Sequence, residues 1–317
     1  MLTANKIYNM EAIEFMKQID SSVVDLVLCD LPYEVTQNDW DKKLNLQEFF
    51  QECWRVLKEQ GTIVLTSQQP FTTDLINADR QNFKYELIWD KIRTSGFLNA
   101  NRMPLRSHEN ILVFYKKLGT YNPQFTQGEK SHSKGKMTTD VNNNYGTYGK
   151  IDNTEVHGNK KFPKSIHAFI KPHPPIHPTQ KPVELFEWLV KTYSNEGDLV
   201  LDCTIGIGTT AIACQKNNRN FIGNDLNEEF VEIANQQLSQ VQLNAFSNTQ
   251  NSTSSGFPTE NSPNMRYQET SDEVSQILPK KVKRGKTRRY SLNYDKIYGR
   301  TSDNANIKRN KGICSKR

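Results

Sequence analysis

A glycine turn between an apolar run and a helical pattern limits the fold of this chain more than any other feature. Residues 199–201 are apolar, and residues 202–211 follow them with Gly206, Gly208 and Ala211 in G-x-G-x-x-A spacing. Glycine lets a ligand approach the backbone closely where the next helix begins. The segment is therefore typical of an α/β sheet that binds a ligand at the carboxyl ends of its strands.

Asp225 narrows the kind of ligand, because it ends the next apolar run about twenty residues further along the chain. A carboxylate at that place can accept hydrogen bonds from both hydroxyl groups of an adenosine ribose. The turn and Asp225 together predict a cofactor that contains adenosine. NAD and S-adenosylmethionine both meet this condition, so a second site has to distinguish them.

The remaining strand and helix patterns fit the same layout. Residues 23–29 form an apolar run that ends at Asp30, and apolar residues at helical spacing follow at 46–57. We expect Gly61 to end that helix. The other expected strands are 62–65, 85–89, 111–115, 199–201 and 221–224, and the other expected helices begin at Pro182, Thr210 and Glu228 and end near 193, 215 and 238. This alternation predicts an α/β fold with a Rossmann-like, mixed seven-stranded sheet and helices on both faces.

Two segments depart from this pattern. Residues 118–170 lose periodicity, so we expect a loop-rich insertion there. Residues 241–317 are rich in Asn, Ser, Thr and Gln and contain 15 Lys and Arg against 6 Asp and Glu, which predicts a disordered basic tail. Such a tail is typical of a nucleic-acid partner, although a solubilising segment has the same composition. We expect a domain at 1–240 whose halves, about 5–117 and 171–240, flank the insertion.

Asp30-Leu31-Pro32-Tyr33, at the end of the first of these strands, suits chemistry on an amino group attached to an aromatic ring. Such a nitrogen is a poor nucleophile because its lone pair is delocalised into the ring. The Asp30 carboxylate and the Leu31 carbonyl can accept its hydrogen bonds. Pro32 fixes the turn, and Tyr33 offers a ring face to an unstacked base. An isolated tetrapeptide fits a capping turn equally well, so the hypothesis depends on the cofactor turn in the same chain.

Several other chemistries lack the residues that they need. The five cysteines are odd in number and far apart, and we expect reduced thiols rather than a disulfide frame. Transfer to a cytosine ring carbon usually requires a Pro-Cys pair, which is absent. His167, His173 and His177 lie among prolines, so we expect an extended loop and no metal site. No apolar run is long enough to span a membrane, and we expect a cytoplasmic protein.

With these motifs the chain resembles the amino-methylating DNA methyltransferases, which act on adenine or on N4 of cytosine, over roughly residues 5–240. The loop at Asp30 looks like their D-P-P-Y motif with Leu31 in place of the first proline. Residues 202–209 resemble D-P-F-x-G-S-G-T, although Cys203, Thr204 and Ile207 replace Pro, Phe and Ser. Residues 177–182 match H-P-T-Q-K-P, a segment of the pocket for the methionine end of the cofactor. Residues 89–91 and 108–113 resemble strand segments of the catalytic side.

The resemblance implies transfer of a methyl group from S-adenosylmethionine to the exocyclic amino group of adenine in duplex DNA, after base flipping. The aspartate at position 30 favours adenine, and cytosine-N4 is the alternative. The β-type motif order weakens an RNA methyltransferase. An NAD-dependent oxidoreductase and a non-catalytic DNA-binding protein are alternatives from other classes. A cognate restriction endonuclease and an association with the nucleoid, in a bacterial or phage setting, are further expectations.

The residues that we expect in the site fall into three groups. The catalytic residues are Asp30, Leu31, Pro32 and Tyr33, and the cofactor-binding residues are Asp202, Thr204, Gly206, Gly208, Thr209, Asp225, Thr179 and Lys181. The DNA-binding residues are Arg102, Tyr121, Asn122 and Gln124 near the insertion and Lys283, Arg284 and Arg288 in the tail.

Overall fold

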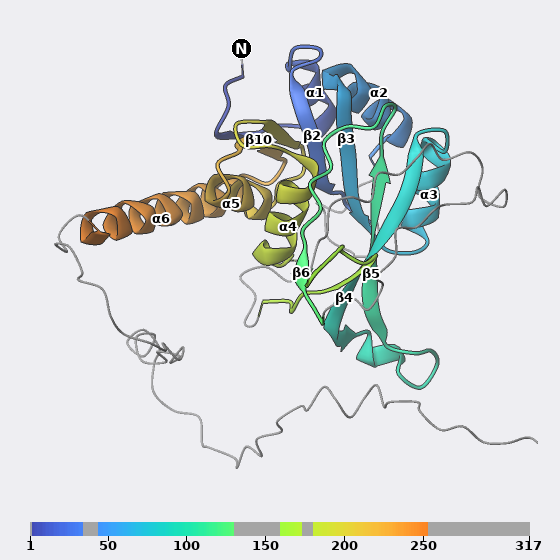
Figure 1. Ribbon diagram of the computed structural model, residues 1–317. Coiled ribbons are helices and arrows are strands. Elements are labelled where there is room, and N and C mark those ends of the chain that lie inside the picture. The colour runs from blue at the N-terminus through green and yellow to red at the C-terminus, as the bar shows by residue number, and fades with distance from the viewer. Residues whose placement is uncertain (1, 34–43, 130–158, 173–179, 253–317) are drawn as a thin grey trace, which may run out of the picture. The chain divides into compact units, whose positions relative to one another are not determined.

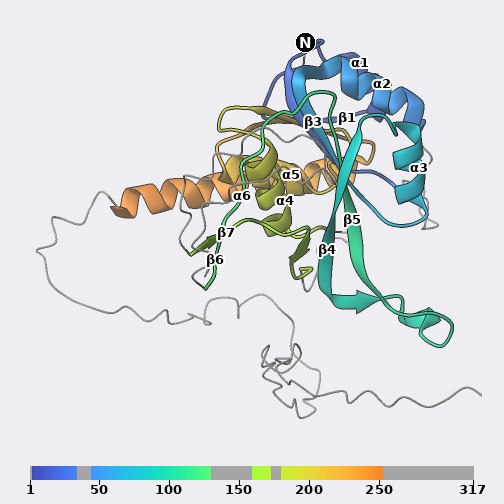
Figure 2. The same ribbon diagram turned by 45° about the vertical axis from the view of Figure 1, so that its right-hand side comes forward.

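One sheet of eight strands organises the described part of the chain, which in this computed structural model comprises residues 2–33, 44–129, 159–172 and 180–252 (Figures 1 and 2). The strands, in spatial order, are β1 (Lys6–Asn9), β10 (Asn220–Asp225), β9 (Leu199–Asp202), β2 (Val24–Asp30), β3 (Leu57–Ser67), β5 (Arg106–Phe114), β4 (Phe83–Ser95) and β8 (Ile166–Ala168). The first five are parallel, β5 is antiparallel to β3 and β4, and β8 is parallel to β4. A separate pair joins β6 (Thr126–Gln127) to β7 (Lys160–Lys161).

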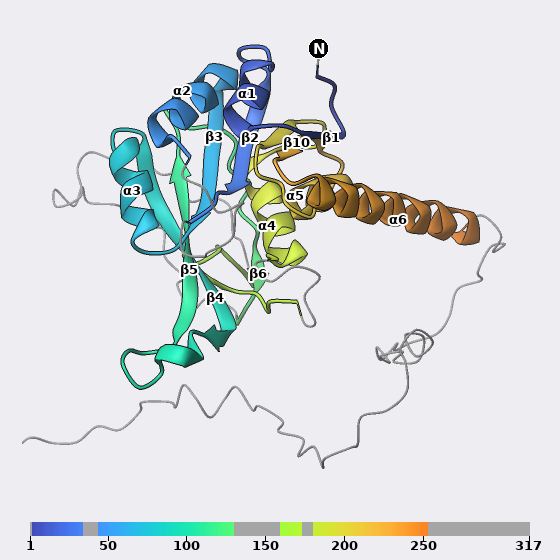
Figure 3. The same ribbon diagram turned by 180° about the vertical axis from the view of Figure 1, so that it is seen from behind.

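Helices cover both faces of this sheet (Figures 1 and 3). The helices α1 (Ala12–Lys17), α2 (Leu46–Val56) and α3 (Phe71–Ala78) share one apolar core with the sheet, and α4 (Val183–Tyr193), α5 (Thr209–Lys216) and α6 (Glu228–Ser252) share another. Alternate residues of β2 enter the two cores. Val27 and Cys29 belong to the first core, and Leu26 and Leu28 belong to the second. The predicted α/β class with helices on both faces is confirmed, and β8 adds an eighth strand at the edge.

The structure corrects four expected boundaries. Gly61 does not end α2, because β3 begins directly after the helix and runs through Gly61. The polar residues between positions 89 and 111 continue β4 and β5 into a long hairpin, closed by the 3-10 helix η1 (Phe97–Asn99). The last helix continues to Ser252, well beyond the expected end at 238. The elements β1, α1 and α3 were not predicted.

The described residues belong to a single compact unit. Residues 1–256 form one compact unit, and residues 257–317 lie outside the described residues. The expected boundary at residue 240 falls inside α6, so the first residues of the expected tail are helical. None of the helices in the described part is long and apolar enough to cross a membrane.

The parallel strands bring three aspartates to one edge of the sheet. Asp30, Asp202 and Asp225 are the last residues of β2, β9 and β10, three strands that lie side by side. The short strands fix this placement, because each has a buried centre and ends at its aspartate. Loops at this edge are where α/β sheets bind their ligands.

Candidate active site

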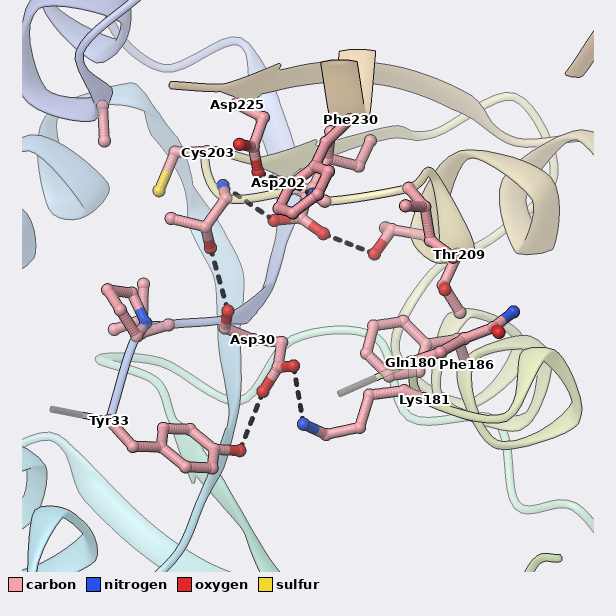
Figure 4. Close-up of a pocket in the computed structure, with 18 of the residues that line it drawn as sticks. Asp30, Tyr33, Gln180, Lys181, Phe186, Asp202, Cys203, Thr209, Asp225 and Phe230 are labelled. Carbon is pink, nitrogen blue, oxygen red and sulfur yellow. Dashed lines mark hydrogen bonds and ion pairs between the residues drawn. The ribbon is translucent and has the colours of Figure 1, made fainter. Parts of the chain in front are cut away.

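A cavity of about 520 Å³ opens at this edge, between the ends of β2, β9 and β10 (Figure 4). Its volume lies within the range of small-molecule sites. Asp30, Leu31, Pro32, Tyr33, Lys181, Asp202, Thr204, Gly206, Thr209 and Asp225 line it, so ten of the twelve residues that we expected for catalysis and cofactor binding come together. Of the other two, Thr179 lies outside the described residues, and Gly208 is not among the lining residues.

Asp225 and the glycine turn are joined directly. The Gly206 amide donates a hydrogen bond of 2.8 Å to Asp225 Oδ2, and the Asn227 amide donates one of 2.9 Å to Oδ1. Gly206 has a φ of +53° and no atom near the place where a Cβ would lie, so its backbone borders open space. Gly208, at φ +93°, has another use: a Cβ there would lie 2.9 Å from the Ala234 Cβ of α6. We infer that Gly208 allows α6 to pack against the turn.

Asp202 is a buried carboxylate beside this turn, with 2% of its surface exposed. Its Oδ1 accepts a hydrogen bond of 3.1 Å from the Thr204 amide, and its Oδ2 accepts one of 2.5 Å from Thr210 Oγ1. Burial raises the pKa of Asp202 to about 7, although both hydrogen bonds act in the opposite direction. Asp202 therefore changes its charge near neutral pH in the cofactor-free protein.

The Asp30 carboxylate is held by three donors from three different segments, and Figure 4 shows two of them, Tyr33 and Lys181. Its Oδ1 accepts hydrogen bonds from the Tyr33 hydroxyl at 2.8 Å and from Thr66 Oγ1, at the end of β3, at 2.5 Å. Its Oδ2 lies 2.6 Å from the Lys181 ammonium. Thr204 Oγ1 donates a hydrogen bond of 3.2 Å to the Asp30 carbonyl, which couples the cofactor turn to the loop.

Tyr33 contacts its neighbours through both its hydroxyl and its ring. Its hydroxyl is bonded to Asp30 and Thr66, its ring packs against Phe71 at 5.6 Å between centroids, and the Lys181 ammonium lies 5.1 Å from its ring centre. Burial and the nearby carboxylates raise the pKa of the Tyr33 hydroxyl, so it stays protonated and donates to Asp30. Its hydroxyl, rather than its ring face alone, therefore contributes to the loop.

Lys181, from the H-P-T-Q-K-P segment, lies between two carboxylates. Its ammonium contacts Asp30 and also Glu109 Oε2 of β5, at 3.4 Å, and the buried Lys91 lies 3.3 Å from Glu109 Oε1. Burial of Lys181 disfavours its charged form, but Asp30 and Glu109 outweigh this effect and raise its pKa. Lys181 is therefore a charged donor that borders the same cavity.

Thr204 stands where the family motif has phenylalanine, and aromatic side chains from other elements border the cavity near it. Phe186 of α4 and Phe230 of α6 line the cavity beside the turn (Figure 4). Trp89 lines it too and donates a hydrogen bond of 2.9 Å from its indole nitrogen to the Phe169 carbonyl. Sequence reasoning missed Thr66, Glu109, Phe186 and Phe230, and only the segment at 108–113 gave a signal, through its resemblance to a family strand.

The residues expected to bind DNA are divided. The Asn122 amide nitrogen lies within hydrogen-bond distance of the Lys191 and Ser194 carbonyls at the end of α4, and the Gln124 amide donates to the Asn122 carbonyl. These bonds anchor the chain to α4 and do not favour base recognition. Tyr121 is half exposed and packs near Tyr193, whereas Arg102 is exposed in the hairpin between β4 and β5. Lys283, Arg284 and Arg288 lie outside the described residues.

The cysteines of the described residues lie in the core. Cys29, Cys53, Cys203 and Cys214 are buried and unpaired, and Cys314 lies outside the described residues. Within the described part of the chain, no three His, Cys, Asp or Glu side chains gather in a way that would hold a metal ion.

Comparison with known proteins agrees with this arrangement. The profile of the DNA methylase family matches residues 24–236. The type II methyltransferase M1.MboII of Moraxella bovis is 30% identical over 269 residues, which cover 77% of this chain and all of that protein. The DNA adenine methyltransferase YhdJ of Escherichia coli is 28% identical and covers 74% of this chain and 83% of its own length.

Solved structures share the fold. A complex of M1.HpyAVI with S-adenosylmethionine has a TM-score of 0.52 at 21% identity and covers 74% of this chain and 98% of its own. The cytosine-N4-specific PvuII DNA methyltransferase has a TM-score of 0.51 at 14% identity and covers 72% and 84%. The fold is thus that of S-adenosylmethionine-dependent methyltransferases. Together with the family profile and the 30% identity to M1.MboII, this shows that the chain belongs to the DNA amino-methyltransferase family, whose members modify adenine N6 or cytosine N4.

Proposed function

We propose that this protein transfers a methyl group from S-adenosylmethionine to the N6 amino group of adenine in duplex DNA. The observation that carries the proposal is that the Asp30 carboxylate and the turn joined to Asp225 border one cavity. A methyl donor on the turn and an amino group at Asp30 would therefore meet inside it. Holding two reactants in this way supplies a large part of catalysis without a covalent intermediate.

The groups that line the cavity suit S-adenosylmethionine. Each Asp225 oxygen accepts a backbone hydrogen bond, and a carboxylate has about four lone-pair sites, so this side chain is suited to accept hydrogen bonds from ribose hydroxyls as well. Phe186 and Phe230 offer apolar surface for the adenine ring, and Asp202 offers a charge to the methionine end. The open space at Gly206 lets the ligand contact the backbone. The bound donor would supply a methyl group already activated by positive sulfur.

The loop at Asp30 would bind and orient the target amino group. The Asp30 carboxylate and the Leu31 carbonyl are the proposed acceptors. Leu31 lines the cavity and its side chain is apolar, so it can accept a hydrogen bond only through its backbone carbonyl, which the exchange of proline for leucine leaves in place. Tyr33 and Thr66 hold the Asp30 carboxylate in place, which fixes the direction in which the amine approaches.

Adenine is favoured over cytosine by two observations. The residue at position 30 is aspartate, as in the adenine-specific members that the loop resembles, and the relative YhdJ is named a DNA adenine methyltransferase. The cytosine-N4 enzyme is the second candidate, because the PvuII enzyme has the same fold. The type II names of several relatives support a partner restriction endonuclease.

The hairpin between β4 and β5 is the proposed DNA contact on the described part of the chain. It extends past the edge of the sheet where the cavity opens (Figure 2). Residues 92–107 carry the exposed Arg93, Arg102 and Arg106 and no acidic residue, and Leu98 at the tip is fully exposed. Positive charge without acidic neighbours suits a phosphate backbone.

Single-molecule sequencing of DNA from cells with and without the protein would test this function, since it reports the base and its sequence context together. We expect N6-methyladenine at one recognition sequence. The variant Asp30→Ala is expected to abolish it. The matched control is Asp25→Asn, which changes an aspartate at the other end of β2 that pairs with Lys58 at 2.7 Å. Methylation that persists in Asp30→Ala would contradict the role of Asp30, and methylation that falls on cytosine would contradict the adenine assignment.

A further inference from the structure

Four charged groups form a row beside the cavity, and both of its lysines are buried. Lys91, Glu109, Lys181 and Asp30 alternate in sign, with successive nitrogen–oxygen distances of 3.3, 3.4 and 2.6 Å. Lys91 and Lys181 are 5% and 6% exposed, so water solvates neither ammonium to any extent. The row comes from β4, β5, the segment before α4 and the end of β2, and it therefore depends on the assembled fold.

Glu109 Oε2 is the incomplete member of this row. It is buried and accepts no hydrogen bond among the described residues, although Lys181 Nζ lies 3.4 Å away. A charge-assisted hydrogen bond is shorter, about 2.7–2.9 Å, and a buried oxygen without a donor is costly. Lys181 is thus a donor placed between two acceptors, and it is bonded to only one of them.

The other acceptor is Asp30, and both of its carboxylate oxygens already accept hydrogen bonds. Its Oδ1 takes two hydroxyl hydrogen bonds and its Oδ2 takes the Lys181 ammonium. An entering amino group is neutral, and a neutral donor competes poorly with a charged one, whose hydrogen bond is about twice as strong. With Lys181 in this place, Asp30 is a weak acceptor for the amine that it is proposed to hold.

We propose that Lys181 moves its hydrogen bond from Asp30 Oδ2 to Glu109 Oε2 when the target amino group enters, which makes Glu109 a positioning residue for the reaction. This inference rests on the proposed function. The exchange breaks one charge-assisted hydrogen bond and forms another, so the row keeps its net charge and transfers no proton. The raised pKa of Lys181 keeps it charged at both positions. Lys91 holds the far oxygen of Glu109, which keeps Oε2 directed at Lys181.

Glu109→Gln and the double variant Glu109→Gln with Lys181→Met test the exchange. In Glu109→Gln, Asp30 is the remaining carboxylate partner of Lys181 in the row, so the ammonium stays on Asp30. We expect the single-turnover rate of methyl transfer per folded molecule to fall roughly ten- to hundred-fold, the scale of one hydrogen bond to a charged group, with KM for DNA changed less than about two-fold. The double variant should be faster than Glu109→Gln alone, because its Asp30 is no longer covered.

The assay uses the full chain, tritiated S-adenosylmethionine and unmethylated bacterial genomic DNA amplified in vitro. Glu109→Asp should recover part of the lost rate, since it restores a carboxylate. Glu52→Gln is the matched control: Glu52 is also buried and pairs with Arg55 at 2.7 Å, but it lies on α2 away from the cavity. We expect this variant to keep its rate per folded molecule.

Two results would overturn the exchange: a wild-type rate in Glu109→Gln, or a double variant no faster than Glu109→Gln. A purely structural Glu109 gives the second result, because removing a further buried contact does not restore chemistry. Failure of the proposed function is seen separately, as absent transfer by the wild-type chain or continued transfer by Asp30→Ala.

Discussion

Asp202 makes the stability of the cofactor-free protein depend on pH in a calculable way. Burial raises its pKa from the ordinary 3.8 to about 7. Between these values the folded state keeps a proton that the unfolded state has released, so stability falls as pH rises through this window and levels off above about pH 7. The full effect is about 4 kcal/mol, of which about 2 kcal/mol falls between pH 5.5 and 8.

Asp202→Asn removes this titration and nearly preserves the shape of the side chain. We expect the free energy of unfolding of Asp202→Asn, relative to the wild type, to increase by about 2 kcal/mol between pH 5.5 and 8. Urea titrations followed by tryptophan fluorescence measure this difference. Asp202→Ser should show the same pH dependence at a lower overall stability, because it also lacks the carboxyl group. Wild-type and Asp202→Asn curves that stay parallel across this range would refute the reasoning.

Further changes test three other features of the protein, with one control variant. Asp225→Ala should weaken S-adenosylmethionine binding at least about ten-fold by calorimetry, and an unchanged affinity would remove Asp225 from the ribose role. Gly208→Ala should lower the free energy of unfolding by about 2–4 kcal/mol, through its positive φ and its contact with Ala234. Gly197→Ala, at φ +84° with no atom near its Cβ, should cost only about 1–2 kcal/mol, and equal losses would rule out the contact. Removal of residues 253–317 should lower DNA affinity and flatten its salt dependence, whereas an unaltered salt slope would make the tail a solubilising segment.

The sequence predicted the parts of the site that depend on local pattern. The strands that end at Asp30, Asp202 and Asp225 are short apolar runs, and the turn at Gly206 follows one of them directly, so their place at one edge could be derived. The ion pairs of Lys181 could not, because they join residues from distant segments whose spacing carries no periodic signal.

Other differences also have physical causes. The hairpin beyond Trp89 is rich in Arg, Ser and Asn. Its sequence looks like that of a loop because most of its side chains are exposed and enter no core. The end of α6 has few apolar residues, so its helix shows no clear amphipathic pattern beyond Leu238. The role of Asn122 at the end of α4 depends on a contact across 69 residues, which local reasoning does not detect.

The neighbouring strands β2 and β9 have a consequence for how the protein matures. They pair Leu26 with Val200 and Val27 with Leu201, and the bond from Thr204 to Asp30 spans 174 residues. Contacts between such distant residues form late, because a long loop must close first. During synthesis, therefore, the cavity cannot be complete until the chain beyond Asp225 has left the ribosome. A nascent chain that stops earlier contains the whole catalytic loop and yet has no place to bind a cofactor.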